Sequence, residues 1–138
     1  MKVGLIGLGR MGEGMSRRMI KAGIEVHGYR NNLEKAQEQY YKGYISGYTT
    51  SLESLVQVVH SNKTTGETPG VFMMVVPAET VEDTLNELLQ FCVEGDIIID
   101  HGNSNFKDSR RRASKIGRQA DTAVSAPPTI RQYPRSRP

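Results

Sequence analysis

The feature that most constrains this chain is a glycine-rich hexapeptide near its start, Gly7-Leu8-Gly9-Arg10-Met11-Gly12. It follows the strand-forming run Lys2 to Ile6 and opens a segment whose apolar residues have helical spacing, namely Met11, Met15, Met19 and Ala22. Strand, glycine turn and helix in this order are the context in which a GxGxxG motif binds a dinucleotide. Gly7 would permit the turn, Gly9 would let the backbone approach a pyrophosphate, and Gly12 would let helix and strand pack closely. A glycine-rich turn without a ligand is the alternative.

Predicted strands and helices alternate along the rest of the chain. The further strands are expected at 24–29, 44–48, 71–76 and 97–100, and the helices at 33–41, 51–60, 80–89 and 105–117. Such alternation predicts an α/β fold of the Rossmann type, a doubly wound and mostly parallel sheet in a single domain. Ligands bind such sheets at the carboxyl ends of the strands, so the informative loops are 7–12, 30–32, 76–79 and 101–105.

The second informative loop indicates which dinucleotide would bind. Domains that bind NAD usually place an acidic residue about 20 residues beyond the glycines, where it holds the ribose 2′-hydroxyl. Here Arg30 stands at the end of the strand, followed by Asn31 and Asn32, with no Asp or Glu. A guanidinium suits a 2′-phosphate by charge and by geometry, so we expect NADP as cofactor, with NAD possible. The alternative is an ordinary solvated arginine.

The two later loops carry weaker signals. Val76, Pro77 and Ala78 end a buried strand with a flat edge along which a cofactor could pass, although a plain strand terminus explains them more simply. Asn103 has an amide that can bond both cofactor and substrate. His101 fits a turn or local packing better than catalysis. No metal site is expected from the sequence.

Composition and charge limit the class of protein. The 138 residues are 37% hydrophobic and 24% charged, as in ordinary globular domains. The single cysteine excludes an intramolecular disulfide and favours a cytoplasmic location, and no apolar run approaches the ~20 residues of a membrane span. Residues 1–106 carry 9 Lys/Arg against 13 Asp/Glu, whereas residues 107–138 carry 9 against 2. Without interleaved aromatic residues, this basic end predicts a solvated helix and a disordered terminus rather than a nucleic-acid partner.

Three motifs, at residues 4–12, 75–78 and 95–112, resemble the N-terminal domain of 6-phosphogluconate dehydrogenase, of the β-hydroxyacid dehydrogenase superfamily. The resemblance covers about residues 1–117, which we take as the dinucleotide-binding domain. It implies that Gly7 to Gly12 hold the pyrophosphate and that Arg30, Asn31 and Asn32 hold the adenosine ribose. It also implies that Val76, Pro77 and Ala78 line the cofactor, and that Asn103 contacts cofactor and substrate.

The resemblance further implies an activity in the pentose phosphate pathway. The family oxidises the C3 hydroxyl of 6-phosphogluconate, a small phosphorylated sugar acid, by hydride transfer to NADP or, in some members, NAD. The 3-keto intermediate then loses carbon dioxide to give ribulose 5-phosphate, and no metal is needed. The family's catalytic lysine and glutamate belong to a helical C-terminal domain that this chain lacks. We therefore assign no catalytic residue here and expect the chain alone to be inactive.

The chain departs from the family at two places. His101 stands where the family usually has glycine, and the Val-Ser-Gly-Gly loop expected after residue 117 is missing. We expect residues 118–138 to be a divergent, basic, Pro/Arg-rich and disordered tail of a truncated or frameshifted product, or of a fragment. The surface left by the missing domain could support a homodimer. Two alternatives are another β-hydroxyacid dehydrogenase-type enzyme acting with a second chain, and a non-catalytic nucleotide-binding or interaction module.

Overall fold

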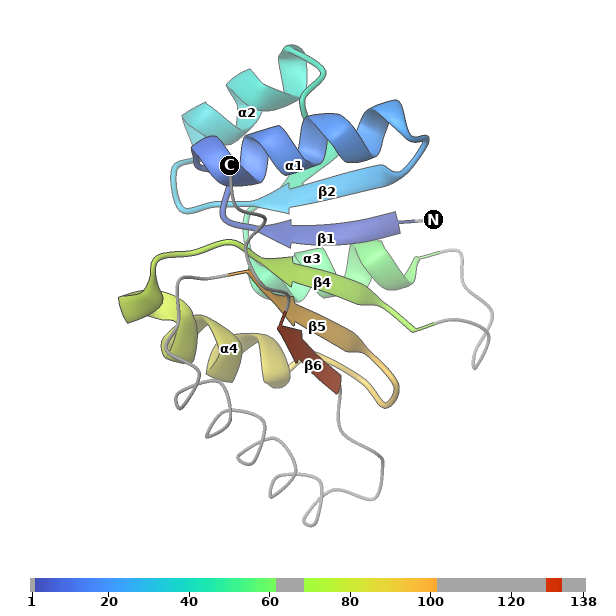
Figure 1. The fold of residues 1–138 in the computed structure, drawn as a ribbon, viewed down its shortest axis with the longest axis vertical. Coiled ribbons are helices and arrows are strands. Elements are labelled where there is room, and N and C mark those ends of the chain that lie inside the picture. The colour runs from blue at the N-terminus through green and yellow to red at the C-terminus, as the bar shows by residue number, and fades with distance from the viewer. Residues whose placement is uncertain (1, 62–68, 102–128, 133–138) are drawn as a thin grey trace.

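A computed structural model describes residues 2–61, 69–101 and 129–132, and it contains a six-stranded parallel sheet (Figure 1). The strand order is β3-β2-β1-β4-β5-β6, so the order reverses between β1 and β4. The strands are β1 (Lys2–Ile6), β2 (Glu25–Tyr29), β3 (Gly47–Thr49), β4 (Val71–Met74), β5 (Ile97–Asp100) and β6 (Thr129–Gln132). The reversal leaves a crevice at the carboxyl ends of β1 and β4, where ligands of such sheets bind.

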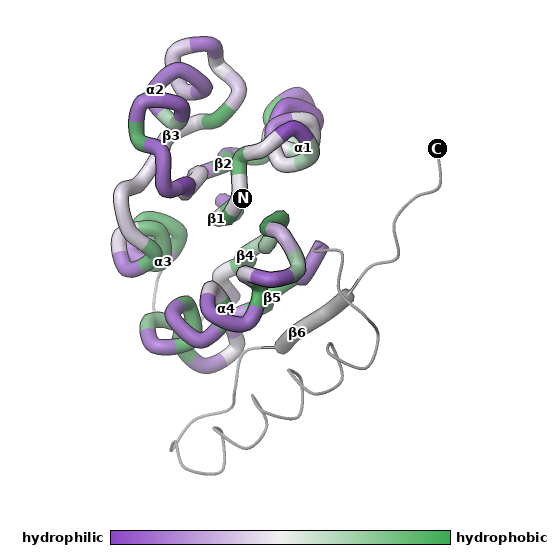
Figure 2. The backbone as a smooth tube through the Cα atoms, turned by 90° about the vertical axis from the view of Figure 1, so that its left-hand side faces the viewer, coloured by the Kyte–Doolittle hydropathy of each residue, from purple (hydrophilic) through white to green (hydrophobic). Residues whose placement is uncertain are grey.

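Helices cover both faces of the sheet. They are α1 (Arg10–Lys21), α2 (Leu33–Tyr41), α3 (Leu52–His60) and α4 (Val81–Leu89), with a short 3₁₀ turn, η1 (Ala78–Thr80), before α4. Figure 2 shows α1 and α2 on one face and α3 and α4 on the other. Crossovers between parallel strands are right-handed, so reversing the strand order moves the helices to the opposite face. The doubly wound Rossmann-type sheet in a single domain is thus confirmed over the described residues.

The core forms two clusters, one on each side of the sheet. Successive side chains of a strand point to opposite faces, so in β1 Leu5 belongs to the cluster beneath α1 and Ile6 to the cluster beneath α3 and α4. Phe72 of β4 and Ile98 of β5 are fully buried in the second cluster. Burying each such side chain stabilises the fold by roughly 1.5–3 kcal/mol. The loops at the crevice therefore follow strands that are packed on both faces.

The buried face of α1 does not coincide with the row of apolar residues Met11, Met15, Met19 and Ala22, whose spacing indicated the helix. The buried residues of α1 are Gly12 and Ser16, whereas Met11 is 47% exposed and only Met19 packs partly against the core. A Cβ atom on Gly12 would lie 2.0 Å from the carbonyl oxygen of Gly7. The first turn of α1 comes so close to the glycine turn that only a glycine fits at position 12, whereas Met19 and Ile20 contact the core farther along the helix.

Residues 129–132 also differ from the prediction, which placed them in the disordered tail 118–138. In the structure they form β6, which pairs in parallel with β5 so that Ile98 lies opposite Ile130. β-Branched residues such as Thr129 and Ile130 favour strands, but a strand at this edge depends on a partner that is distant in sequence. The predicted helix at 105–117 lies outside the described residues.

Two strands differ from their expected bounds by more than one residue. The third strand was expected at 44–48 and is observed at Gly47–Thr49. β4 ends at Met74 rather than at Val76, although the amide N–H of Val75 still donates to the carbonyl of Ile6 at 2.8 Å. The chain thus leaves the sheet two residues early and borders the crevice.

At the opposite end of the sheet, the fully buried Asp96 ties three segments together. Its carboxylate accepts hydrogen bonds from the amide N–H groups of Gly70 at 3.0 Å and Val93 at 2.9 Å, and from Nε2 of His60 at 3.1 Å. Burial, with a smaller effect of Asp96, raises the pKa of the neighbouring Cys92 thiol to about 12. The end of α3, the start of β4 and the turn before β5 are therefore joined around one carboxylate.

Candidate dinucleotide-binding site

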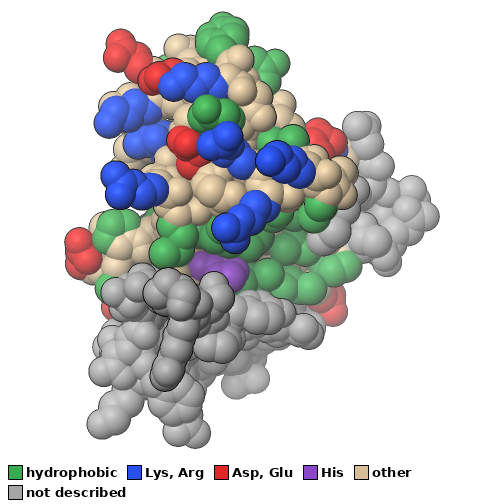
Figure 3. Space-filling view, turned by 45° about the horizontal axis from the view of Figure 1, so that its top comes forward, with side chains coloured by type: hydrophobic (Ala, Val, Ile, Leu, Met, Phe, Trp, Pro, Cys, Tyr) green, Lys and Arg blue, Asp and Glu red, His purple; other side chains and the backbone are tan. Residues whose placement is uncertain are grey.

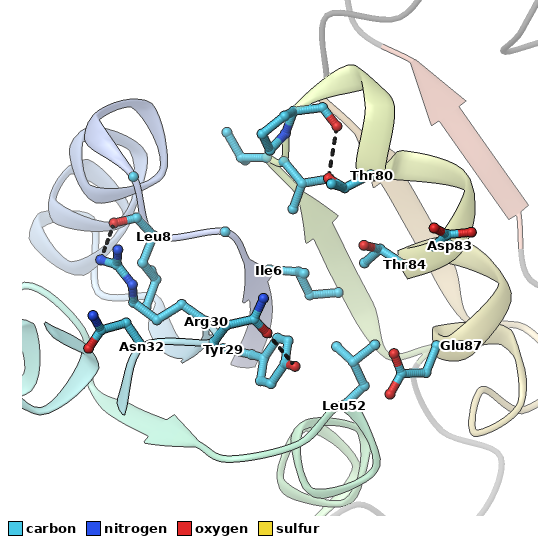
Figure 4. Close-up of a pocket in the computed structure, with 16 residues that line it drawn as sticks. Ile6, Leu8, Tyr29, Arg30, Asn32, Leu52, Thr80, Asp83, Thr84 and Glu87 are labelled. Atoms are coloured by element: carbon cyan, nitrogen blue, oxygen red, sulfur yellow. Dashed lines mark hydrogen bonds between the residues drawn. The ribbon is translucent and has the colours of Figure 1, made fainter. Parts of the chain in front are cut away.

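A cleft of about 580 Å³ opens at the carboxyl ends of β1, β2 and β4 (Figure 4). This volume is within the range of small-molecule and cofactor sites. The cleft is lined by Ile6, Gly7, Leu8, Gly9, Tyr29, Arg30, Asn31, Asn32, Leu52, Val75, Val76, Pro77, Thr80, Asp83, Thr84 and Glu87. These residues come from the glycine loop, the end of β2, the start of α3, the segment after β4, and η1 with α4.

The floor of the cleft is the glycine loop, in which two glycines are required by the protein itself. Gly7 has a φ of +96°, and a Cβ there would lie 2.1 Å from the carbonyl oxygen of Val75. Gly12 packs directly on the Gly7 carbonyl, as described above. These two positions exclude any other residue because backbone atoms, which cannot rotate away, occupy the space.

Gly9 is different, because no described residue requires a glycine there. Its φ of −70° suits any residue, and a Cβ on Gly9 would have no atom within 4 Å. Gly9 is the N-cap of α1 and provides no side-chain hydrogen bond to the helix. The free N–H groups and partial positive charge of a helix N-terminus form a ready site for an anion. The structure therefore leaves an open cradle at Gly9, the position where the motif predicts a phosphate group.

Arg30, at the end of β2, lies against this loop. Its Nη1 donates to the carbonyl of Leu8 at 3.0 Å and to Oε1 of Gln39 at 3.3 Å. Gln39 is itself 7% exposed, and its Nε2 donates to the Leu8 carbonyl at 2.8 Å and to Oε2 of Glu13 at 3.1 Å. Sequence reasoning found Arg30 but missed Gln39. The sequence pattern could have indicated Gln39, because it is a polar residue three positions after Ala36 and so lies on the same, buried face of α2.

The two asparagines after Arg30 have structural partners of their own. Oδ1 of Asn32 accepts a hydrogen bond from the amide N–H of Lys35 at 3.1 Å and so caps α2. Oδ1 of Asn31 accepts from the hydroxyl of Tyr29 at 3.0 Å. Burial, and to a lesser extent Glu87, raises the pKa of the Tyr29 phenol, which stays protonated as a donor. Both asparagines therefore border the cleft with their amide oxygens already engaged.

The far wall of the cleft is a polar face of η1 and α4 that sequence reasoning also missed. Thr80, Asp83, Thr84 and Glu87 lie three or four positions apart and face Ile6 and Leu52 across the cleft (Figure 4). The hydroxyl of Thr80 donates to the carbonyl of Pro77 at 2.9 Å and does not cap α4. The helical spacing of the sequence could have indicated this polar face, because it lies on a different side of α4 from the apolar row of the buried Val81, Leu85 and Leu88.

The structure brings together most of the residues predicted to contact a cofactor. Eight of them line the cleft, namely Gly7, Leu8, Gly9, Arg30, Asn31, Asn32, Val76 and Pro77. Four do not belong to its lining, namely Arg10, Met11, Gly12 and Ala78. Leu8 contributes its backbone, because its side chain is buried against Gly28. Asn103 lies outside the described residues.

His101 extends the sheet beyond β5, because its amide N–H donates to the carbonyl of Met74 at 2.8 Å. Burial lowers the pKa of its imidazole, against a smaller opposing effect of Asp100. The ring is therefore neutral at pH 7. Within residues 2–61, 69–101 and 129–132, no three His, Cys, Asp or Glu side chains gather in a metal-binding arrangement.

A second and smaller hollow, of about 220 Å³, lies on the outer face of α1. It is lined by Gly14, Arg17, Arg18 and Lys21, all of which are exposed. Lys and Arg side chains gather on this side of the molecule (Figure 3). The guanidinium of Arg17 lies 4.3 Å from the ring centre of Tyr44, so part of this charge is held by an aromatic contact. None of the described helices is long and apolar enough to cross a bilayer.

Comparisons with known proteins agree with this geometry. A 6-phosphogluconate dehydrogenase of Chlamydia pneumoniae is 37% identical over 116 residues, which are 83% of this chain and 23% of that enzyme. Two Bacillus subtilis relatives, one named NADP(+)-dependent and one NAD(+)-dependent, are 33% and 29% identical, and the chain spans 24% of each. The chain thus covers about a quarter of the length of these relatives.

The solved structure of Plasmodium falciparum 6-phosphogluconate dehydrogenase has the same fold over 86% of this chain and 25% of that one, with a TM-score of 0.70 at 24% identity. A family model described as the NAD binding domain of 6-phosphogluconate dehydrogenase matches residues 2–128. Fold, glycine loop and family match therefore agree: this chain belongs to the NAD(P)-binding domains of the 6-phosphogluconate dehydrogenase family.

Proposed function

We propose that this chain is the NADP-binding domain of a 6-phosphogluconate dehydrogenase-like oxidoreductase. The whole protein would convert 6-phosphogluconate, a phosphorylated sugar acid, to ribulose 5-phosphate in the cytoplasm. Its acid and base would come from chain outside the residues described here. When bound, the dinucleotide would supply the hydride acceptor, and this chain's part is to hold and orient it. The observation that carries the proposal is the open cradle at Gly9, where a glycine serves no need of the fold itself.

The cradle predicts a loss of binding without a loss of folding in the variant Gly9→Ala. The added methyl group meets no protein atom within 4 Å but occupies the space through which a pyrophosphate approaches the backbone. We expect the dissociation constant for NADPH to rise at least about tenfold, equivalent to about 1.4 kcal/mol. The domain should stay folded with a melting temperature lower by several degrees at most, since alanine is a poorer N-cap than glycine by about 1 kcal/mol.

Fluorescence titration with NADPH measures this effect, and Gly14→Ala is its matched control. Gly14 also has no atom within 4 Å of a Cβ, but it lies on the outer face of α1, away from the cleft. Gly14→Ala should bind NADPH like the wild type. Unchanged binding in Gly9→Ala would mean that no dinucleotide lies on this loop, and the proposed function would have to be abandoned.

The preference for NADP is supported by Arg30. It lies at the end of β2 and lines the cleft where a ribose 2′-substituent is expected, and no carboxylate follows it in the loop. We expect Arg30→Asp to weaken NADPH binding by about 10- to 100-fold, because a charge-assisted hydrogen bond of about 1.5–3 kcal/mol is lost. NADH binding should improve, because aspartate can accept from the ribose hydroxyl. Parallel titrations with NADPH and NADH measure the ratio, and an unchanged ratio contradicts the assignment of Arg30.

A further inference from the structure

A closed hydrogen-bond network joins the glycine loop to α2 beneath the cleft. Both the Arg30 guanidinium and the Gln39 amide donate to the Leu8 carbonyl, at 3.0 and 2.8 Å. Nη1 of Arg30 also donates to Oε1 of Gln39 at 3.3 Å, and Nε2 of Gln39 also donates to Oε2 of Glu13 at 3.1 Å. An Nη1 atom and an amide nitrogen each have two hydrogens, so every donor of these two atoms has an acceptor.

The network fixes the orientation of the Gln39 side chain. The Leu8 carbonyl and the Glu13 carboxylate are acceptors, so the amide nitrogen must face them and the amide oxygen must face Arg30. Gln39 is buried, and among the described residues no other residue of α2 forms a hydrogen bond with the glycine loop. Both the oxygen and the nitrogen of the Gln39 amide are therefore engaged in hydrogen bonds.

The network also determines what Arg30 can offer to a ligand. Only Nη1 is engaged, which leaves Nε and Nη2 without a hydrogen-bond partner among the described residues. Arg30 forms no ion pair with any carboxylate in that part of the chain, because the neutral Gln39 amide stands between it and Glu13. The guanidinium is thus anchored at one corner, with its charge uncompensated and its remaining donors free for an anion. Figure 4 shows it stretched along the cleft floor toward Leu8.

We propose that Gln39 is a positioning residue that selects a 2′-phosphorylated dinucleotide, by anchoring Arg30 without neutralising it. This inference rests on the proposed function, since it requires that Arg30 faces the 2′-phosphate. An amide is the side chain that meets both needs. A carboxylate at position 39 would pair with Arg30, and an apolar side chain would leave Arg30 and the Leu8 carbonyl with fewer partners.

Two variants at this position test the inference. Gln39→Leu keeps the approximate size and removes all three hydrogen bonds, so Arg30 loses part of its anchor. Gln39→Glu keeps the shape but places a negative charge against Arg30 and against Glu13. We expect NADPH affinity to fall about tenfold in Gln39→Leu and further in Gln39→Glu, while NADH affinity changes less than threefold in both. The ratio of the two dissociation constants is the readout, since a purely structural role would lower both affinities together.

Gln37→Leu is the matched control on the same helix. The Gln37 amide donates to the hydroxyl of Tyr48 at 3.2 Å and does not line the cleft. This variant should keep the wild-type ratio, and melting curves on all four proteins show whether each is folded.

The outcomes separate the two proposals. If the wild type binds NADPH no better than NADH, the proposed preference for NADP fails, whatever the variants do. If the wild type prefers NADPH and both Gln39 variants keep that ratio, or lose both affinities equally, the role of Gln39 is overturned while the proposed function stands. A fall in the ratio, larger for Gln39→Glu than for Gln39→Leu, supports the inference.

Discussion

Replacing Gly12 by alanine should destabilise this domain strongly, whereas the same replacement at Gly14 should increase stability slightly. A Cβ on Gly12 would lie 2.0 Å from the Gly7 carbonyl oxygen, inside the contact between α1 and the turn after β1. The Cβ is fixed to the backbone of α1 and the carbonyl to the backbone of the turn, so neither can rotate away and α1 must move away from the sheet. This costs at least about 3 kcal/mol, the upper end of ordinary overpacking. Gly14 is in the same helix with open space around it, and alanine there gains about 0.8–1 kcal/mol of helix propensity.

Thermal unfolding of the two variants and the wild type measures this contrast. For a domain of about 100 residues, 1 kcal/mol corresponds to roughly 4–8 °C in melting temperature. We therefore expect a decrease of more than about 12 °C for Gly12→Ala and a small increase for Gly14→Ala. Equal melting temperatures for the two variants would show that α1 does not approach the glycine turn as closely as the structure has it.

The second large effect is expected at the other end of the sheet, in Asp96→Ala. The fully buried carboxylate accepts from two backbone N–H groups and from His60, and alanine leaves these donors without their acceptor. Breaking such a buried arrangement from one side costs about 3–5 kcal/mol. Asp96→Asn should cost less, because one acceptor oxygen remains.

The control for Asp96 is Glu25→Ala, which removes a second carboxylate that contacts a histidine. Oε1 of Glu25 lies 2.7 Å from Nε2 of His27, but the Glu25 side chain is 47% exposed. Hydrogen bonding to His27 lowers the pKa of Glu25, yet solvent screens such pairs and they contribute less than about 1 kcal/mol. Urea unfolding at pH 7 should therefore separate the two variants by about 2–4 kcal/mol. A loss as small in Asp96→Ala as in Glu25→Ala would contradict the structural role of Asp96.

The sequence was sufficient for the fold and for the floor of the cleft, because both depend on local signals. Alternating strands and helices predict the doubly wound sheet, and the glycine spacing identifies the turn and the helix that follows it. Arg30 could be found because the end of β2 is a fixed distance from the glycines. In each case the residues that matter are neighbours in the sequence or lie at a fixed distance from the motif.

The features that sequence reasoning missed depend on distances between segments. The apolar spacing that predicted α1 does not show which residues of the helix are buried, because it does not register how closely Gly12 approaches the Gly7 carbonyl. Gln39 was missed because its partners, Leu8 and Glu13, are 31 and 26 residues away. The strand at 129–132 was missed because its partner is β5, whereas the surrounding composition is that of a basic tail.

The hydrogen bonds around Asp96 and the cleft beside Arg30 lie at opposite ends of the sheet. β4 begins one residue after Gly70, whose amide N–H donates to Asp96. The last residue of β4, Met74, precedes Val75 of the cleft lining. Substitutions in the loop 30–32 therefore leave the Asp96 contacts intact. The cleft lining and the Asp96 contacts share no described residue, so substitutions at one end of the sheet can accumulate independently of those at the other.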